Sequence, residues 1–194
     1  MKDNVSLKEK FRRELRAENK RHDSENDQAS RDIAVRLKEQ SIWTKSQSIL
    51  FFSPLPGEPD LRFLCSEAIA GGKRVAFPKY SAATDSYSAV AVADASRDLV
   101  PGQFGIPEPN SFCIEVPLNL LDLILVPGLG FSLAGVRLGR GKGYYDRLLA
   151  SVVGVRCGVA FDWQVVAELP TEAHDVFVDC LATPSCWRVF RDVR

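Results

Sequence analysis

The chain has 194 residues, a length that suits one domain with a sizeable hydrophobic core. Its 25 basic and 25 acidic residues leave no formal net charge, which argues against a general binder of nucleic acid or of membrane surfaces. No apolar run approaches the ~20 residues of a membrane span and the N-terminus lacks an apolar signal core, so we expect a cytoplasmic protein.

Two helices are predicted at the N-terminus. Leu7, Phe11 and Leu15 recur every four residues and mark the apolar stripe of the first helix, with its cations on the other faces. Asp23 or Ser24 is expected to cap the second helix. The chain therefore opens with a helical pair.

Short apolar runs then alternate with helical segments. Strands are expected over residues 48–52, 73–77, 87–92, 121–126, 155–161, 176–181 and 187–190, with Pro78 ending the second. Helices are expected over residues 59–70, 144–151 and 163–168. Strands that alternate with helices indicate the α/β class. We expect a single domain over residues 1–194, with a mostly parallel sheet flanked by helices.

The run 138–147, Leu-Gly-Arg-Gly-Lys-Gly-Tyr-Tyr-Asp-Arg, is the most informative segment. Its three glycines alternate with Arg140 and Lys142, and each glycine can adopt φ > 0 and lets a ligand approach the main chain. The helix expected to follow adds N–H donors and a partial positive charge. The segment therefore predicts a polyphosphate cradle, with Asp146 placed to hold a divalent cation against the phosphates.

Two familiar phosphate-binding motifs do not fit this run. A P-loop needs four residues between its first glycine and the Gly-Lys pair, whereas five separate Gly135 from Gly141, and Gly143 stands where Ser or Thr is required. A dinucleotide fingerprint needs glycine in place of Tyr144. A plain glycine-rich turn with solvated cations is the remaining alternative. A binding loop is favoured over it, because so many glycines cost chain entropy when nothing is bound.

Ligands of open α/β sheets bind beyond the carboxyl ends of the strands. Several of the informative segments lie there. Glu58 follows the first predicted strand, Tyr80 the second, the glycine run the strand 121–126, and Asp162 the strand 155–161. We expect these segments to meet at one edge of the sheet.

The cysteines and histidines argue against a protein-built metal centre of the zinc type. The five cysteines are odd in number and none lies in a C-x-x-C pair, so we expect buried packing thiols in a reducing cytoplasm. Two histidines are too few for histidine-rich metal chemistry.

Segments 122–131 and 137–146 closely resemble the 5-formyltetrahydrofolate cyclo-ligase family, also called 5,10-methenyltetrahydrofolate synthetases. The resemblance covers nearly the whole chain. It includes Lys8 and Arg12, the acidic turn at Glu58, and the segments 104–109, 160–162 and 174–175.

The resemblance implies conversion of 5-formyltetrahydrofolate, with or without a polyglutamate tail, into 5,10-methenyltetrahydrofolate. ATP is the co-substrate and Mg²⁺ the cofactor. The formyl oxygen is phosphorylated and nitrogen 10 closes the ring, with release of ADP and phosphate. Phosphoryl transfer needs mostly positioning and charge neutralisation, which cations, backbone donors and a metal supply. A monomer that binds neither nucleic acid nor membrane is expected.

The resemblance also implies the site residues. Those for ATP are Lys8, Glu9, Lys10, Phe11, Arg12, Arg137, Leu138, Gly139, Arg140, Gly141, Lys142, Gly143, Tyr144 and Tyr145. Those for folate are Phe52, Glu58, Tyr80, Phe104, Arg140, Gly141, Lys142, Gly143 and Tyr144. Arg140, Lys142 and Tyr144 are the catalytic residues implied, and Asp146 and Asp175 hold the magnesium ion.

Simpler interpretations exist for several of these residues. Lys8 and Arg12 lie four apart and on sequence alone would be a solvated basic helix face; the resemblance reverses this. Glu58 could be exposed, or buried to accept hydrogen bonds from a pterin. Asp175 precedes an ordinary strand, and His174 is expected to be structural. At the level of function, the alternatives are a non-catalytic nucleotide- or folate-binding protein and a sugar-phosphate or CoA-ester enzyme that needs no ATP.

Overall fold

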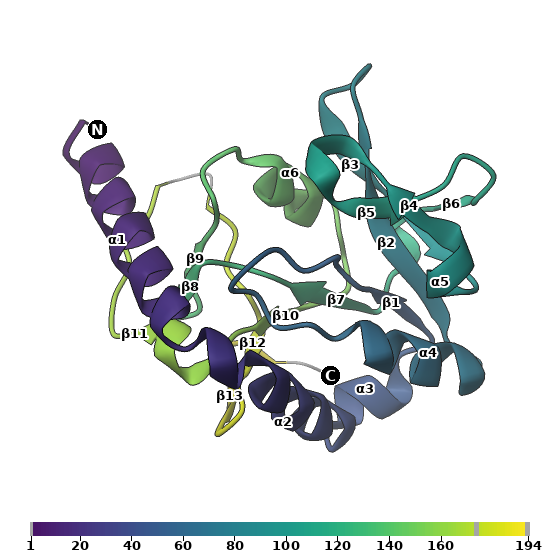
Figure 1. Ribbon diagram of the computed structural model, residues 1–194, viewed down its shortest axis with the longest axis horizontal. Coiled ribbons are helices and arrows are strands. Elements are labelled where there is room, and N and C mark those ends of the chain that lie inside the picture. The colour runs from purple at the N-terminus through teal and green to yellow at the C-terminus, as the bar shows by residue number, and fades with distance from the viewer. Residues whose placement is uncertain (1, 173–174, 193–194) are drawn as a thin grey trace.

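The computed structural model describes residues 2–172 and 175–192, except for the side chains of residues 2–4, 6 and 104. An eight-stranded sheet forms its centre (Figure 1). In order across the sheet, the strands are β13 (Trp187–Val189), β12 (Cys180–Ala182), β10 (Val155–Val159), β7 (Leu123–Val126), β1 (Ser48–Leu50), β2 (Arg74–Ser81), β3 (Ser86–Val92) and β6 (Glu115–Val116). The strands from β12 to β2 are parallel, and β13, β3 and β6 add antiparallel edges.

Alternate residues of the central strands enter two separate cores, because successive side chains of a strand point to opposite faces. Ile49 and Leu123, which are paired in register, enter the core on one face. Leu50 and Ile124, the next pair, enter the core on the other. All four residues of β7 are buried, as a strand covered on both faces requires.

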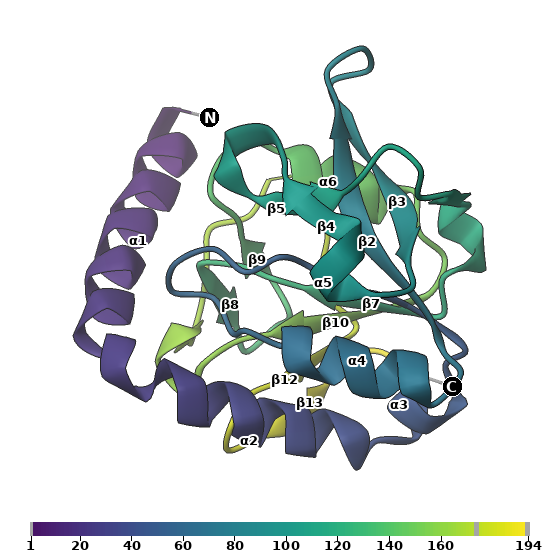
Figure 2. The same cartoon turned by 45° about the vertical axis from the view of Figure 1, so that its right-hand side comes forward.

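Helices cover both faces of the sheet. On one face lie α2 (Asn26–Lys38), α3 (Ser41–Lys45) and α4 (Arg62–Ala70), and on the other lies α6 (Tyr144–Ala150) (Figures 1 and 2). The shorter helical elements are η1 (Asp23–Glu25), α5 (Ala95–Asp98), η2 (Gln103–Gly105), η3 (Leu118–Leu120) and η4 (Asp162–Gln164). The predicted α/β class, with a mostly parallel sheet flanked by helices, is confirmed.

The first helix, α1 (Lys2–Arg21), lies at the side of the molecule (Figures 1 and 2). It packs on a second, three-stranded sheet formed by β11 (Val165–Val166), β8 (Gly130–Ser132) and β9 (Arg137–Leu138). Leu15 is buried there, whereas Leu7 remains 41% exposed, so the predicted apolar stripe is used only in part. The N-terminal helical pair itself is confirmed. A two-stranded sheet, β4 (Leu99–Pro101) with β5 (Pro107–Pro109), completes the strands of the described part of the chain.

Several predicted boundaries were wrong. Strand β2 runs through Pro78, where the prediction ended it. Strand β1 pairs with β2 only as far as Ala76, so the N–H that proline lacks removes no hydrogen bond between β1 and β2. The helix predicted over 163–168 is instead the short turn η4 followed by β11, whose pairing with β8 overrides local preference.

Other differences are smaller. The second helix begins at Asn26 after the turn η1, and among the described residues no side chain caps it. The helix predicted from residue 59 begins at Arg62, and the strand predicted from 176 begins at Cys180. Of the five free cysteines, Cys65, Cys157 and Cys180 are buried as expected, and the other two are half-buried. No helix within the described residues has the length and apolar character needed to cross a membrane.

Candidate active site

The parallel sheet changes its direction of winding between β1 and β7. The chain goes from β1 to β2 on one side, and from β7 to β10 and β12 on the other. The loops at the carboxyl ends of two such neighbouring strands diverge and leave a crevice, which is where ligands bind in open α/β sheets. The predicted meeting of loops at this edge is therefore observed for the loop that carries Glu58 and for the glycine run.

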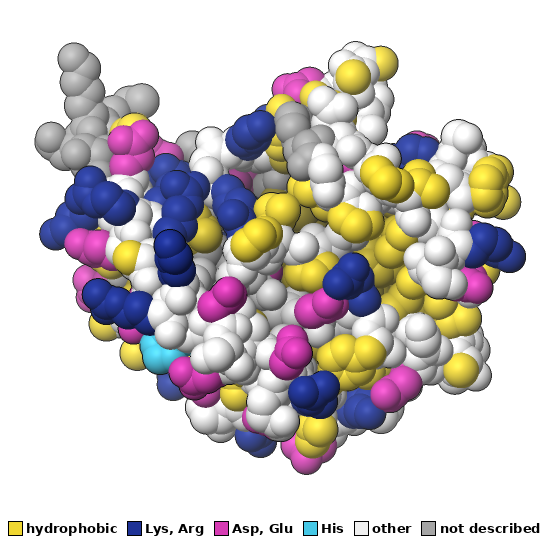
Figure 3. All heavy atoms as spheres, viewed as in Figure 1, with side chains coloured by type: hydrophobic (Ala, Val, Ile, Leu, Met, Phe, Trp, Pro, Cys, Tyr) yellow, Lys and Arg dark blue, Asp and Glu magenta, His cyan; other side chains and the backbone are white. Residues whose placement is uncertain are grey.

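A cavity of about 400 Å³ lies in this position. Figure 3 shows the molecule hollowed between α1 and the β2–β3 hairpin, with Lys and Arg side chains gathered over α1 beside the hollow. The residues that line the cavity include Arg16, Phe52, Ser53, Leu55, Glu58, Pro78, Tyr87, Ile106, Pro107, Glu108, Pro127, Gly128, Arg137 and the segment 139–146. Its volume falls within the range of about 300–1,000 Å³ that is usual for small-molecule sites.

The glycine run forms one wall of the cavity, and its glycines are needed for two reasons. Gly141 and Gly143 have φ values of +103° and +69°, which side-chain-bearing residues rarely adopt. At Gly139, a Cβ atom would lie only 3.0–3.2 Å from the guanidinium of Arg137. The backbone of the run is thus bare toward the cavity, and α6 begins directly after Gly143.

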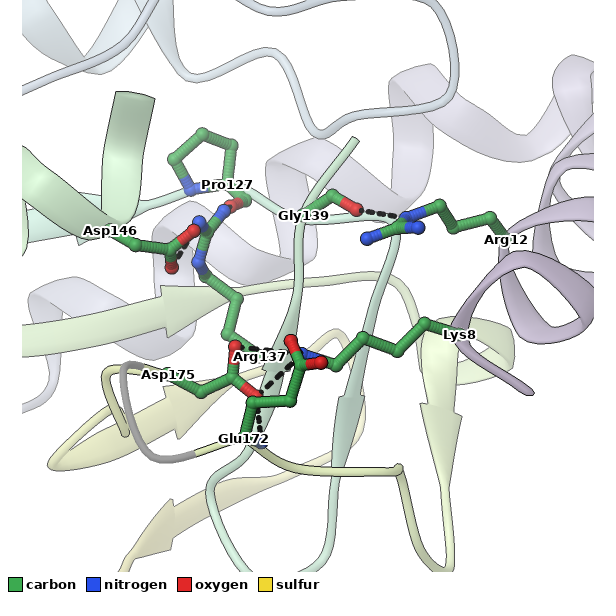
Figure 4. Close-up of polar contacts among 8 residues, drawn as sticks. All are labelled: Lys8, Arg12, Pro127, Arg137, Gly139, Asp146, Glu172 and Asp175. Atoms are coloured by element: carbon green, nitrogen blue, oxygen red, sulfur yellow. Dashed lines mark hydrogen bonds and ion pairs between the residues drawn. The ribbon is translucent and has the colours of Figure 1, made fainter. Parts of the chain in front are cut away.

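Arg137 is hydrogen-bonded to residues on both sides of this wall. Its side chain is 5% exposed, and its Nη2 donates to Asp146 Oδ1 at 2.8 Å while its Nη1 donates to the carbonyl of Pro127 at 3.1 Å (Figure 4). The guanidinium also lies 5.5 Å from the ring centre of Tyr145. Arg137 therefore joins the loop after β7 to the first turn of α6.

Arg140 crosses the cavity mouth to the loop after β1. Its Nε donates to Glu58 Oε1 at 3.0 Å, and its Nη2 donates to the carbonyl of Pro56 at 2.9 Å. Glu58 Oε2 accepts from the Leu55 backbone N–H at 3.0 Å. Burial raises the pKa of Glu58, although the charge of Arg140 opposes the shift. Glu58 is thus buried, and the exposed alternative is wrong.

Two cations of helix α1, Lys8 and Arg12, bond to other parts of the chain but do not themselves line the cavity. The Nζ of Lys8 donates to both oxygens of Asp175, at 2.9 and 2.8 Å, and to Glu172 Oε2 at 2.9 Å (Figure 4). Burial lowers the pKa of Lys8, but the hydrogen bonds to Asp175 and Glu172 outweigh this and leave it raised. The Nε of Arg12 donates to the carbonyl of Gly139 at 3.1 Å. A solvated face is therefore the wrong interpretation for this pair.

The two predicted magnesium ligands differ in their surroundings. Asp146 lines the cavity beside the glycine run, and its second oxygen is not used by Arg137. Both oxygens of Asp175 accept from Lys8, and Oδ2 also accepts from the Glu172 N–H at 2.7 Å. In residues 2–172 and 175–192, no group of three His, Cys, Asp or Glu residues could hold a metal ion. Magnesium is usually held by one or two carboxylates plus phosphate oxygens and waters. Asp146 has the position for such a ligand, whereas Asp175 does not line the cavity and has both oxygens bonded to Lys8.

Tyrosines cluster where α6 meets the β2–β3 hairpin. The ring of Tyr144 lies 5.4 Å from that of Tyr80 and 5.8 Å from that of Tyr87, in edge-on contacts. The Tyr145 hydroxyl is buried with no hydrogen-bond partner among the described residues, and burial raises its pKa. Of the described tyrosines on the hairpin, Tyr87 lines the cavity, while the Tyr80 hydroxyl donates to Asp85 at 2.8 Å.

The remaining predicted residues lie in varied places. Glu9 and Lys10 are exposed on α1, whereas Phe11 and Leu138 pack with Leu15. Phe52 and Lys142 line the cavity. The side chain of Phe104 and all of His174 lie outside the described residues.

Sequence reasoning missed several residues of the cavity wall, among them Arg16, Tyr87 and Glu108. Arg16 could have been found, because it continues the spacing of four that relates Lys8 to Arg12. Glu108 stands between two prolines in a segment that carried the family resemblance, but nothing in the sequence signals its burial.

Known proteins of one family are similar to this chain over most of its length. Residues 4–184 match the profile of the 5-formyltetrahydrofolate cyclo-ligase family. The chain is 30% identical over 156 residues to the 5-formyltetrahydrofolate cyclo-ligase of Escherichia coli K12, which covers 78% of this chain and 86% of that protein. The solved 5,10-methenyltetrahydrofolate synthetase of Aquifex aeolicus is 36% identical, with a TM-score of 0.87 over 97% of this chain and 95% of that one. A Mycoplasma pneumoniae synthetase, 20% identical with a TM-score of 0.72 over 91% and 98% of the two chains, shares the fold.

Proposed function

Because the chain belongs to the 5-formyltetrahydrofolate cyclo-ligase family, we propose that it catalyses the ATP- and Mg²⁺-dependent conversion of 5-formyltetrahydrofolate into 5,10-methenyltetrahydrofolate. The observation that carries the proposal is the composition of a single cavity. A bare glycine run with Arg140 and Lys142 forms one side, suited to phosphates, and the buried acid Glu58 and the ring of Phe52 lie in the same space, suited to a pterin.

The reaction needs both ligands in one place. The formyl group is an amide, and its oxygen is a poor leaving group. Transfer of the γ-phosphoryl group of ATP to that oxygen releases ADP and leaves an iminium phosphate. Nitrogen 10 then attacks the activated carbon and loses its proton, and inorganic phosphate departs as the ring closes. Charge neutralisation and positioning account for most catalysis of such a transfer.

The residues divide the work according to their positions. Lys142 and the backbone N–H groups of the glycine run neutralise the transferred phosphoryl group. Arg140 links the two substrates, since it lies on the phosphate side and is bonded to Glu58 on the folate side. Arg12 fixes the run from outside through the carbonyl of Gly139. Tyr144 and the folate contacts of Phe52, Tyr80 and Phe104 remain predictions from the resemblance.

Magnesium, when bound, would neutralise charge on the phosphate oxygens. Asp146 is the residue of this chain that would hold it, because Asp146 lines the cavity in the first turn after the glycine run. Arg137 orients that carboxylate through the 2.8 Å bond to Oδ1. Asp175 is proposed as a second ligand that exchanges Lys8 for the metal.

One assay tests the proposed function. The protein is incubated with 5-formyltetrahydrofolate with and without ATP and Mg²⁺, and the near-ultraviolet absorbance of the methenyl product is followed. Product that appears only when ATP and Mg²⁺ are both present is the expected result. Folate binding without product would instead indicate a non-catalytic binding protein, and product without ATP would contradict the phosphorylation step. We further propose that the whole chain, residues 1–194, acts as one monomeric, cytoplasmic domain.

A further inference from the structure

Glu108 is an acidic residue of the cavity wall to which the proposed function gives no role. It lies in β5 and is 6% exposed. Its Oε1 atom is buried and accepts no hydrogen bond from any described residue. A buried acceptor without a donor is unfavourable, because it has given up water and gained nothing in exchange. Such an atom at the wall of a binding cavity indicates a donor that arrives with the ligand.

The backbone at Gly102 leaves space for the Glu108 side chain. A Cβ atom at Gly102 would lie 2.6 Å from Glu108 Cγ and 2.7 Å from its Cβ and Cδ. Glycine at position 102 therefore makes room for the Glu108 side chain, which packs against the backbone of the neighbouring strand end. Burial raises the pKa of Glu108, and nearby backbone N–H groups and the charge of Lys79 oppose the shift only in part. The carboxylate is thus held in a poorly solvated position.

Glu108 and Glu58 differ in what they still lack. Each oxygen of Glu58 already has a donor, Arg140 on one and the Leu55 N–H on the other. Glu108 has an oxygen with none among the described residues. Glu58 also lies on the cationic side of the cavity. Glu108 instead shares the wall with Pro78 and Ile106 and lies near Tyr87, whose pKa is raised by burial first and then by the charge of Glu108. That apolar and aromatic wall suits a flat ring with polar edges.

We propose that Glu108 accepts hydrogen bonds from the N–H donor edge of the reduced pterin, formed by its 2-amino group and ring N3–H. The proposal rests on the proposed function and assigns to that site a specificity-determining residue. A carboxylate only accepts hydrogen bonds and can take two parallel N–H donors. The terminal torsion of a glutamate is soft, so a small rotation turns the unpartnered oxygen toward the ring.

The test uses Glu108→Gln in the full chain, with Glu115→Gln as the matched control, because Glu115 is an exposed glutamate on β6 outside the cavity. Calorimetric titration measures the affinity for 5-formyltetrahydrofolate and, separately, for ATP. Loss of a hydrogen bond to a charged group should weaken folate binding by about 10- to 100-fold. ATP affinity should stay within about twofold, and the control should match the wild type.

An analogue of 5-formyltetrahydrofolate with hydrogen in place of the 2-amino group provides a second measurement. The wild type should bind it about 10-fold or more weakly than the parent, whereas Glu108→Gln should discriminate far less between the two. Equal affinity of the wild type for both compounds would overturn the proposal even if the variant failed to fold.

The remaining outcomes are also decisive. Wild-type folate affinity in Glu108→Gln, or an equal loss of ATP and folate affinity, would refute the role of Glu108. A wild-type protein that bound no 5-formyltetrahydrofolate at all would instead refute the proposed function.

Discussion

The pair formed by Glu58 and Arg140 provides a measurable link between the cavity and folding stability. Replacing Arg140 with Met keeps a long apolar side chain but removes the donor 3.0 Å from Glu58 Oε1. The Glu58 side chain is 5% exposed, so in the variant its charge loses a partner that water cannot fully replace. Arg140 is the largest influence that lowers the pKa of Glu58, so that pKa should rise further in the variant.

The structure sets the size of the effect. Hydrogen bonds to charged groups contribute about 1.5–3 kcal/mol, and because Arg140 is itself one-third exposed we expect about 2 kcal/mol near pH 8. That is roughly a 30-fold change in the folding equilibrium, against a total stability of about 5–15 kcal/mol.

The loss should depend on pH with a definite sign. A carboxyl group whose pKa is raised by folding stabilises the folded state fully below its unfolded pKa of 4.5 and loses this contribution as the pH rises through the folded value. Removal of Arg140 raises the folded-state pKa of Glu58 further, so this dependence of stability on pH extends to higher pH. The variant should therefore be close to the wild type near pH 4.5 and fall progressively below it toward pH 8.

Urea denaturation at several pH values tests this prediction. The cycle comprises the wild type, Arg140→Met, Glu58→Gln and the double variant, and the second substitution should cost less when the first is present. Lys38→Met is the matched control, because the pair of Lys38 and Glu67 is about half exposed and should contribute no more than about 1 kcal/mol. An Arg140→Met loss of the same size at pH 4.5 and pH 8, or additive losses in the cycle, would refute the reasoning.

Four further predictions concern activity and binding. Lys142→Ala should reduce turnover by about 10²-fold or more, as removal of a transition-state charge contact does, with an unchanged urea midpoint because the residue is exposed; wild-type turnover would contradict the cradle. Gly143→Ala, at φ +69°, should weaken ATP binding and destabilise the fold by about 1 kcal/mol, as calorimetry and urea melts would show. Glu58→Gln should weaken folate binding and spare ATP binding in separate titrations; a variant that lost only ATP affinity would contradict this role. Asp146→Asn should raise the Mg²⁺ concentration for half-maximal activity more than Asp175→Asn does, and equal half-saturation in Asp146→Asn and the wild type would remove Asp146 from the metal site.

What could be predicted from the sequence follows from how local each signal is. The glycine run was identified because φ > 0 is almost restricted to glycine, and Gly141 and Gly143 adopt it. The α/β class follows from the alternation of apolar strands and helices. The segment 163–168 was assigned wrongly because a short apolar run fits a helix or a strand equally well, and only its pairing with β8 decides.

The site was less accessible to sequence reasoning because its contacts are distant along the chain. The family resemblance implied a role for Lys8. Its partner Asp175, however, lies 167 residues away, and no periodicity in the sequence indicates such a pairing. The burial of Glu108 depends on the absence of a side chain at Gly102, which in the sequence looks like an ordinary turn glycine. Tyr87 was missed because its strand alternates only weakly, so its cavity-facing side was not evident.

The position of α1 has a consequence for synthesis of the protein on the ribosome. This helix is translated before the residues that anchor it, which are Gly139 through its carbonyl, the pair Glu172 and Asp175, and the buried Leu169. The helix alone is amphipathic and marginal in water, and most helical stability comes from packing. It can therefore dock fully only after residues 136–175, which hold its anchors, have left the ribosome. A nascent chain cut short before Leu169 keeps Val136 and Leu138 but lacks the anchors of α1 from Leu169 onward, so the cavity wall that includes Arg16 is secured only after those anchors are made.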